Sequence, residues 1–243
     1  ATLPSRGSTW PLGMTMVSIS ELSVIEDDDE LLVSARVTTP GHDEVLWHRL
    51  PSDAGTNAAN AADSFFVVGL MLAMSSDHVL VIDAEVSPRL LRASTRVQEI
   101  LAAWSPAKIG RASIDAAPRL MLTAAPAGRP AIACFTGGVD SFYTLATNTD
   151  RISALLYMHG FDIPLKDVEF RKITSGHLKD AALTAGTRLI EGSTNLRQFL
   201  DPFMSWGRIS HGAALASVGH LLGSEYSSLI TPATHPHADH YAW

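Results

Sequence analysis

The stretch CFTGGVDS, residues 134–141, combines residue types that can hold a phosphate group. Its two glycines allow positive φ angles and let the backbone come close to a ligand, and the free N–H groups at the start of a following helix attract anions. The hydroxyls of Thr136 and Ser141 add hydrogen-bond donors. A phosphate cradle is one interpretation, and a simple turn from a strand into a helix, capped by Asp140 or Ser141, is the other.

The stretch differs from the two best known phosphate-binding loops. It lacks the lysine of G-x-x-x-x-G-K-[ST] and the third glycine of G-x-G-x-x-G. FTGGVDS, residues 135–141, instead resembles the Ser-Gly-Gly-x-Asp-Ser signature of the PP-loop ATP pyrophosphatases. That superfamily includes asparagine, GMP and NAD synthetases, tRNA-lysidine synthetase and 7-cyano-7-deazaguanine synthase. Thr136 departs from the usual serine but keeps its hydroxyl.

The resemblance implies an enzyme that uses ATP and Mg²⁺ to adenylate an oxygen of a small-molecule acceptor. Pyrophosphate leaves, and a nitrogen nucleophile then displaces AMP, which is the activity of an AMP-forming ligase. Metal and backbone donors would neutralise the charge on the leaving pyrophosphate, and Asp140 takes the position beside the metal. The implied cradle consists of Thr136, Gly137, Gly138, Val139, Asp140 and Ser141.

Further polar residues follow the next predicted strand, which ends in LYMHGFD, residues 156–162. Ligands of parallel sheets bind at the carboxyl ends of the strands. We therefore expect Met158 and Gly160 to bind the nucleotide, with Tyr157 also near the base and with His159 and Asp162 facing the site. A buried strand followed by a glycine turn is the alternative.

Two later stretches also carry candidate side chains. Asn195 and Arg197 in EGSTNLRQF are suited to hold a carboxylate or phosphate, or else begin a solvated helical turn. In WGRISHGAALASVGHLLG, Arg208 is a candidate for stabilising charge during adenylyl transfer. His211 precedes small residues that allow close approach of a ligand. Asp140, Arg208 and His211 are the predicted catalytic residues.

The histidine-rich stretch TPATHPHADH and the single cysteine suggest other chemistry. His235, His237, Asp239 and His240 are spaced as in an extended loop, which favours an active-site loop over a structural zinc site. Cys134 alone allows neither a disulfide within the chain nor a multi-cysteine metal cage. Its place inside a predicted strand indicates a buried, inert thiol, which disfavours a persulfide relay.

Periodicity predicts an α/β protein with a smaller N-terminal α/β domain, residues 1–128. Its first 50 residues alternate apolar and polar positions, as in β-hairpins, with EDDDE, residues 26–30, at a tip. An apolar core helix follows Asp63 as N-cap, a strand covers His78–Ala84, and a second helix begins with Ser87 as cap and Pro88 at its first position. A short strand at RLMLT, residues 119–123, precedes the boundary.

Residues 129–243 alternate strands with helices, which predicts a parallel-sheet, Rossmann-like ATP pyrophosphatase domain. The predicted strands are AIACF, ISALLYMHG, TRLIEGS and SSLITPA, and the helices between them are DSFYTLATN, GHLKDAALTAG and HGAALASVGHLLG. The chain begins without methionine and ends at Trp243 inside a polar stretch, so we expect the protein to continue.

Composition limits the partners. Hydrophobic residues make up 46% and charged residues 18% of the chain, as in a globular protein. A net charge of −7 gives no overall basic field, so nucleic acid is an unlikely partner. The most apolar segment, Ser64–Met74, is shorter than the roughly 20 residues that span a bilayer. The first residues lack the pattern of a signal peptide, so no membrane and a cytoplasmic location are expected.

Several alternatives stay open. A sulfur transferase or tRNA-modifying enzyme of the same superfamily is one, and an ATP-binding sensor without turnover is another. The N-terminal part does not resemble a glutamine-hydrolysing domain, so ammonia, an amine or a sulfur donor, free or from a partner protein, would supply the nucleophile. The N-terminal part would then select the substrate or form a homodimer.

Overall fold

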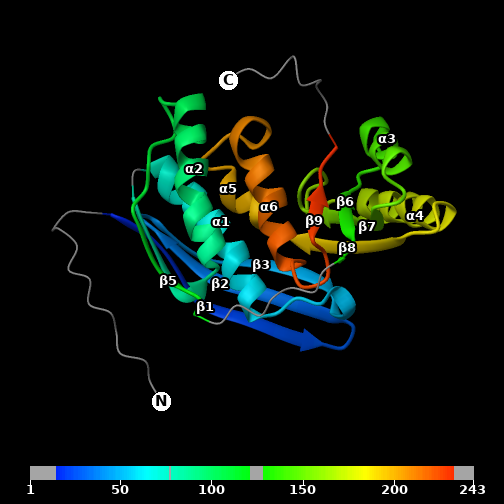
Figure 1. Ribbon diagram of the computed structural model, residues 1–243, viewed down its shortest axis with the longest axis horizontal. Helices are drawn as coiled ribbons and strands as arrows, with labels where there is room; N and C mark the ends of the chain where they lie inside the picture. The colour runs from blue at the N-terminus through cyan, green and yellow to red at the C-terminus, as the bar shows by residue number, and fades with distance from the viewer. Residues whose placement is uncertain (1–14, 77, 121–127, 233–243) are drawn as a thin grey trace.

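The structure is a computed structural model that describes residues 15–76, 78–120 and 128–232. The strands of this part are β1 (Met16–Asp27), β2 (Glu30–Thr39), β3 (His42–Pro51), β4 (Val79–Val86), β5 (Ile114–Pro118), β6 (Ala131–Cys134), β7 (Ile152–His159), β8 (Arg188–Thr194) and β9 (Ser228–Ile230). The helices are η1 (Ser52–Ala54), α1 (Ala58–Ser76), α2 (Pro88–Trp104), α3 (Val139–Thr147), α4 (Val168–Thr184), α5 (Leu196–Leu200), η2 (Trp206–Ser210) and α6 (His211–Leu221). Figure 1 shows their arrangement.

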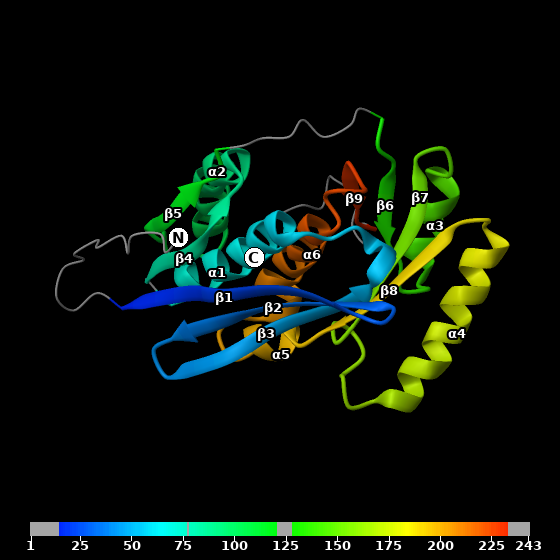
Figure 2. The ribbon, with the colours of Figure 1, turned by 90° about the horizontal axis from the view of Figure 1, so that it is seen from below.

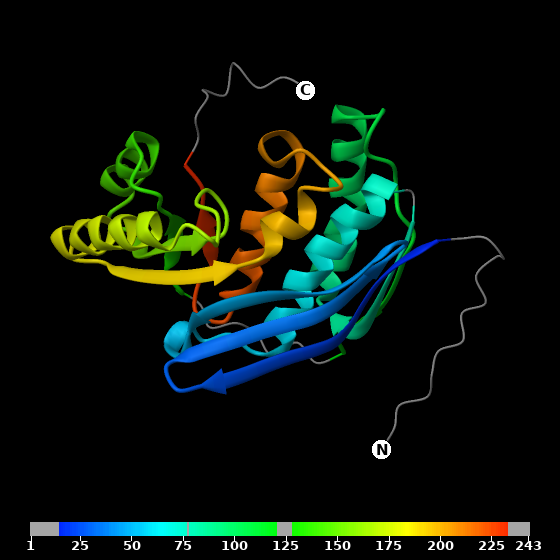
Figure 3. The same ribbon diagram turned by 180° about the vertical axis from the view of Figure 1, so that it is seen from behind.

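The strands form a single mixed sheet in the order β5-β4-β1-β2-β3-β8-β7-β6-β9. β1, β2 and β3 pair antiparallel, and the turn between β1 and β2 at Asp28–Asp29 confirms the hairpin tip predicted for the acidic run. In β2 every second residue is buried, as expected of a strand with one face on the core. Helices α1, α2 and α6 lie on that face (Figure 3).

Helix α1 begins earlier than the sequence predicted. The Asn57 side chain accepts the Asn60 N–H and so caps it, whereas Asp63 lies inside the helix and pairs with Arg119 at 3.0 Å. The prediction of Asp63 as N-cap was therefore wrong, because a distant arginine satisfies this carboxylate. At 19 residues α1 is also longer than expected. Among the described residues it is the one helix whose length and composition would allow it to cross a membrane. Since 72% of its apolar window is buried, it serves as a core helix.

The strands β8, β7, β6 and β9 are mutually parallel, as predicted. Successive connections from β6 lead to β7 and β8 on one side, and the chain then returns to place β9 on the other side of β6. Helices α3 and α4 cover one face and α6 covers the opposite face (Figure 2). The sheet therefore reverses its direction of growth next to β6, and such switch points are where open α/β sheets bind ligands.

The two predicted parts of the chain share one sheet and one large core. β3 pairs antiparallel with β8 through His48 opposite Thr194 and Arg49 opposite Ser193. Across the core, the hydroxyls of Ser64 in α1 and Ser217 in α6 form a buried hydrogen bond of 2.8 Å. The helix start at Ser87 and Pro88 agrees with prediction. The strand predicted at 119–123 was wrong in its bounds, because β5 ends at Pro118 and residues 119 and 120 are outside any strand; residues 121–123 lie outside the described residues. Residues 235–240 lie outside the described residues.

Candidate functional site

The loop after β6 is held at its start by a backbone hydrogen bond, and the chain changes direction at one glycine. Phe135 donates its backbone N–H to the Leu156 carbonyl of β7 at 2.8 Å, which extends the parallel pairing by one residue. Gly137 has a φ of +76°, in the left-handed region that favours glycine. Gly138 is extended and forms the N-cap of α3, so the chain passes from strand to helix within three residues. This is the strand, glycine turn and helix that the sequence predicted.

The loop is open to solvent. All residues 136–140 are exposed, and the exposed fraction of the Val139 side chain reaches 85%. The first N–H groups of any α-helix have no partner inside the helix, and at this helix start the N-cap residue offers no side chain to accept them. The arrangement therefore leaves backbone donors available at the end of a parallel strand, which is suited to an anion.

Ser141 differs from the other cradle residues. It is buried, with 3% of its surface exposed, and its hydroxyl donates to the Gly138 carbonyl at 2.7 Å. Its hydroxyl therefore stabilises the first turn of α3. Thr136 is exposed, so of the two predicted hydroxyls it is the one open to a ligand.

Asp140 is exposed in the first turn of α3, beside the glycine pair. Among the described residues no group of three His, Cys, Asp or Glu side chains is arranged to hold a metal ion. Mg²⁺ is commonly bound through one or two carboxylates together with substrate phosphates and water. A single exposed carboxylate beside the glycine turn fits an ion that shares its ligands with a bound phosphate, and does not fit a preformed metal cage.

A second cluster gathers around Trp206, and we call it the Trp206 cluster: Phe161, Arg197, Trp206 and His211. The Arg197 guanidinium donates to the Phe161 carbonyl at 2.5 Å and lies 5.0 Å from the centre of the Trp206 ring. The ring of Trp206 also contacts those of Phe161 and His211, with centroids 5.2 and 5.1 Å apart. Residues that follow β7 and β8 thus meet the start of α6.

The cluster contains His211 but not Arg208. Arg208 is exposed and, with Trp104 and Lys108, lines a separate cavity of about 290 Å³ at the end of α2. The cation that the structure brings to His211 is Arg197. The sequence signal for Arg197 was its place shortly after a strand. That signal is weaker than the one for Arg208, which lies beside a predicted helix start.

Met158 and Gly160 serve the packing of β7. Met158 is buried, and its sulfur lies 2.7 Å from where a Cβ on Gly192 would be, so its packing against β8 closes it to a ligand. Gly160 has a φ of +102°, and a Cβ there would lie 2.0 Å from the Thr194 carbonyl oxygen. The close approach of the β7 and β8 ends therefore explains this glycine.

The neighbouring Tyr157 and His159 are buried at the end of β7. The Tyr157 hydroxyl and the His159 Nδ1 have no hydrogen-bond partner within the part of the chain that the structure describes. Burial, helped by the charges of Glu191 and Asp162, raises the pKa of Tyr157 to about 12. Burial also lowers the pKa of His159. Both groups are therefore uncharged at neutral pH.

A charged cluster on α4 and β8 was not among the predicted site residues. Glu191 of β8 accepts a hydrogen bond of 2.5 Å from the Ser175 hydroxyl and lies 3.7 Å from Arg171 and 3.5 Å from Lys179. The three α4 residues are four positions apart, which places them on one helix face, and that spacing was the available signal. Leu178 of the same helix lies 3.1 Å from a Cβ built on Gly137, so α4 also supports the loop.

Two other candidates have structural roles. The Asn195 amide bonds to the backbone of β3 and is not free to hold a ligand anion. Cys134 is buried in β6, and burial raises the pKa of its thiol to about 12. The thiol therefore stays protonated at neutral pH, and the protonated form is a poor nucleophile. His220 is partly buried on α6.

Comparison with known proteins adds no relative to these observations: no protein-family model, no curated protein and no solved structure matches this chain.

Proposed function

We propose that this protein is an ATP-dependent, AMP-forming ligase that adenylates a small-molecule acceptor. The observation that carries the proposal is the exposed Gly137-Gly138 turn, which leads from β6 into α3 at the switch point of the parallel strands. Exposed backbone donors at such a point favour a polyphosphate. The resemblance of residues 135–141 to the PP-loop signature supports ATP over other phosphate compounds.

In this proposal the backbone of residues 136–140 binds the β and γ phosphates, and the Thr136 hydroxyl adds a donor. Asp140 would hold Mg²⁺ together with phosphate oxygens, and the bound ion would supply positive charge against the leaving pyrophosphate. Gly138 lets the backbone approach the phosphates because it carries no side chain.

The reaction follows from charge and leaving-group chemistry. An oxygen of the acceptor attacks the α phosphorus, the bond to the bridging oxygen breaks, and pyrophosphate departs with its electron pair. A nitrogen nucleophile, ammonia or an amine, free or from a partner protein, then attacks the activated carbon and AMP leaves. Arg197 of the Trp206 cluster, which follows β8, would offset the negative charge of the acceptor or of AMP.

Product analysis with ATP, Mg²⁺ and a panel of small carboxylic acids with ammonia tests the proposal. We expect AMP and pyrophosphate in equal amounts. ADP with phosphate would refute the mechanism, and ATP binding without pyrophosphate under any condition would indicate a nucleotide-binding protein without turnover.

A matched pair of variants separates the site from the fold. Asp140→Asn should lower pyrophosphate release by at least about a hundredfold, since about 2.7 kcal/mol of transition-state stabilisation is typical for one such group. Asp150→Asn is the control, because Asp150 is exposed just after the opposite end of α3. Equal loss in both variants would contradict the assignment of Asp140.

A further inference from the structure

A large cavity lies away from the glycine loop. Its volume is about 860 Å³, within the range of small-molecule sites. It is bordered by the starts of α1 and α2, the end of α6 and strands β6 and β9. Its strand residues, Ile132, Ser228 and Leu229, precede the carboxyl ends where the glycine loop begins, and no residue of the loop lines it. The cavity is therefore separate from the proposed phosphate site.

The charge of the lining is positive although the whole chain carries −7. Three arginines line the cavity, against one carboxylate: Arg89, Arg119, Arg129 and Asp63. His220, also in the lining, is neutral near pH 7 because burial lowers its pKa, although the charge of Asp63 partly opposes this shift. Tyr226 is neutral too, because burial raises the pKa of its hydroxyl. The lining thus carries a net charge of about +2 at neutral pH.

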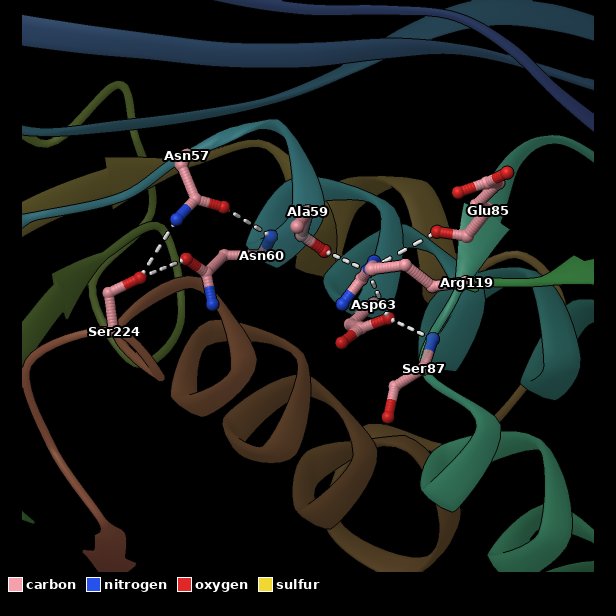
Figure 4. A network of polar contacts seen from close by, with 8 residues as sticks. All are labelled: Asn57, Ala59, Asn60, Asp63, Glu85, Ser87, Arg119 and Ser224. Carbon is pink, nitrogen blue, oxygen red and sulfur yellow. Dashed lines mark hydrogen bonds and ion pairs between the residues drawn. The ribbon is translucent and has the colours of Figure 1, made fainter. Parts of the chain in front are cut away.

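The Asp63 carboxylate is already paired with one of these arginines. Asp63 accepts hydrogen bonds from the Arg119 guanidinium at 3.0 Å and from the Ser87 N–H at 2.8 Å, and Arg119 also donates to the Ala59 and Glu85 carbonyls (Figure 4). This pair cancels its own charge, and Asp63 also holds the backbone N–H of Ser87, the N-cap residue of α2. Asn57 caps the start of α1 with its side chain.

The other two arginines retain uncompensated charge. Arg129 donates only to the Gly223 and Ser224 carbonyls at the end of α6, and its buried Nε has no partner in the described residues. Arg89, on the first turn of α2, is exposed at the cavity and has no ion pair or hydrogen bond in the described ranges. Two cations therefore face one cavity without a counter-charge.

The remaining lining can hold the body of a ligand. Leu90, Ile132 and Leu229 supply an apolar patch, and a polar network of Asn57, Asn60 and Ser224 forms one wall (Figure 4). Glycines and alanines at positions 59, 93, 216, 219 and 223 keep the space open. We propose that this cavity is a second ligand site that binds a small organic anion, a carboxylate or a phosphate, through Arg89 and Arg129.

Binding is tested on the full chain by calorimetry with citrate as the carboxylate probe and AMP and pyrophosphate as the phosphate probes. We expect at least one probe to bind and Arg89→Gln to weaken it by about tenfold, equivalent to about 1.4 kcal/mol. Arg92→Gln is the matched control, since Arg92 is exposed on the same helix outside the lining. The probe that binds identifies the ligand class.

A second readout places the anion. The NMR titration of the His220 ring, assigned with His220→Gln, should show a higher pKa when the anion is bound, because a nearby negative charge favours the imidazolium. Gly138→Ala should leave this response unchanged, which separates it from ATP binding at the loop. Three results would overturn the proposal: no binding of any probe, equal affinity in Arg89→Gln and Arg92→Gln, or loss of the His220 response in Gly138→Ala.

Discussion

The side-chain amide of Asn195 takes the place of a strand residue beside Trp47. Its Oδ1 accepts the Trp47 N–H at 2.9 Å, and its Nδ2 donates to the Val45 carbonyl at 2.9 Å. The preceding residue, Thr194, adds a bond from its hydroxyl to the Trp47 carbonyl at 2.8 Å. The backbones of β3 and β8 pair at only two positions, and these side-chain bonds lengthen that pairing. They therefore help to hold the N-terminal hairpins to the parallel strands.

Asn195→Ala should therefore destabilise the protein by about 1–3 kcal/mol, since it leaves two backbone groups of β3 without partners. Urea unfolding measures the change. Gln198→Ala, at an exposed position of α5, is the control and should change the free energy of unfolding by less than about 0.5 kcal/mol. If both variants unfold at the same urea concentration, the amide does not hold the two halves together.

The two loop glycines should separate folding from binding. Gly137→Ala forces a side chain into a φ of +76° and should cost about 1 kcal/mol or more. Gly138→Ala meets no atom closer than 3.8 Å, so its cost in folding should stay below about 1 kcal/mol. If the backbone approaches phosphates as proposed, Gly138→Ala should still weaken ATP binding at least about tenfold in calorimetry. Unchanged ATP affinity in this variant would indicate that the loop is a simple turn and does not bind phosphate.

His48 should make stability fall in acid. It is fully buried against Phe65, neither ring nitrogen has a partner in the described structure, and burial lowers its pKa to about 3. Between pH 6.5 and about 3 the unfolded chain binds a proton that the folded chain does not, so stability is lost as the pH falls through this window, by up to about 1.4 kcal/mol per pH unit.

Thermal unfolding of His48→Leu across that window measures this effect. The variant should show a shallower loss of stability in acid than the natural chain. His177→Gln, at an exposed histidine of α4, should keep the original slope and is the control. Parallel curves for the natural chain and His48→Leu would show that His48 is protonated in the fold.

Two further glycines should respond in opposite directions. Gly160→Ala drives a Cβ to 2.0 Å from the Thr194 carbonyl, which the packed strand ends cannot relieve, so we expect a loss of more than about 3 kcal/mol. Gly176 is exposed in the middle of α4, and a Cβ there would meet no atom within 4 Å. Gly176→Ala should therefore stabilise the protein by about 0.5–1 kcal/mol. Circular dichroism on heating measures both, and a stable Gly160→Ala variant would contradict the described approach of β7 and β8.

Much of the fold was predictable because it depends on residues that are close together in the sequence. Alternating burial in β2, the Ser87-Pro88 start of α2 and the strand and helix order after β6 follow from periodicity and caps within a few residues. The glycine turn at Gly137 was also readable, because only a residue without a side chain adopts that conformation at little cost. These features depend on neighbours in the chain.

The remaining features depend on residues far apart in the chain. Asp63 reads as a helix cap until Arg119, 56 positions later, claims its carboxylate. Arg197 looks like a solvated side chain until Trp206 and Phe161 close around it. Arg208 and His211 look like partners by spacing, yet Arg208 lines a different cavity at the end of α2. No periodicity encodes such pairs.

The α/β class, the parallel strands and the glycine turn follow from the sequence, since hydrophobic periodicity and backbone preference act over short distances. The pairing of β3 with β8, which joins the hairpins to the parallel strands, and the gathering of three arginines at one cavity depend on the folded chain. Such contacts arise when segments far apart in the chain bury their faces together, and burial selects them after the local elements have formed.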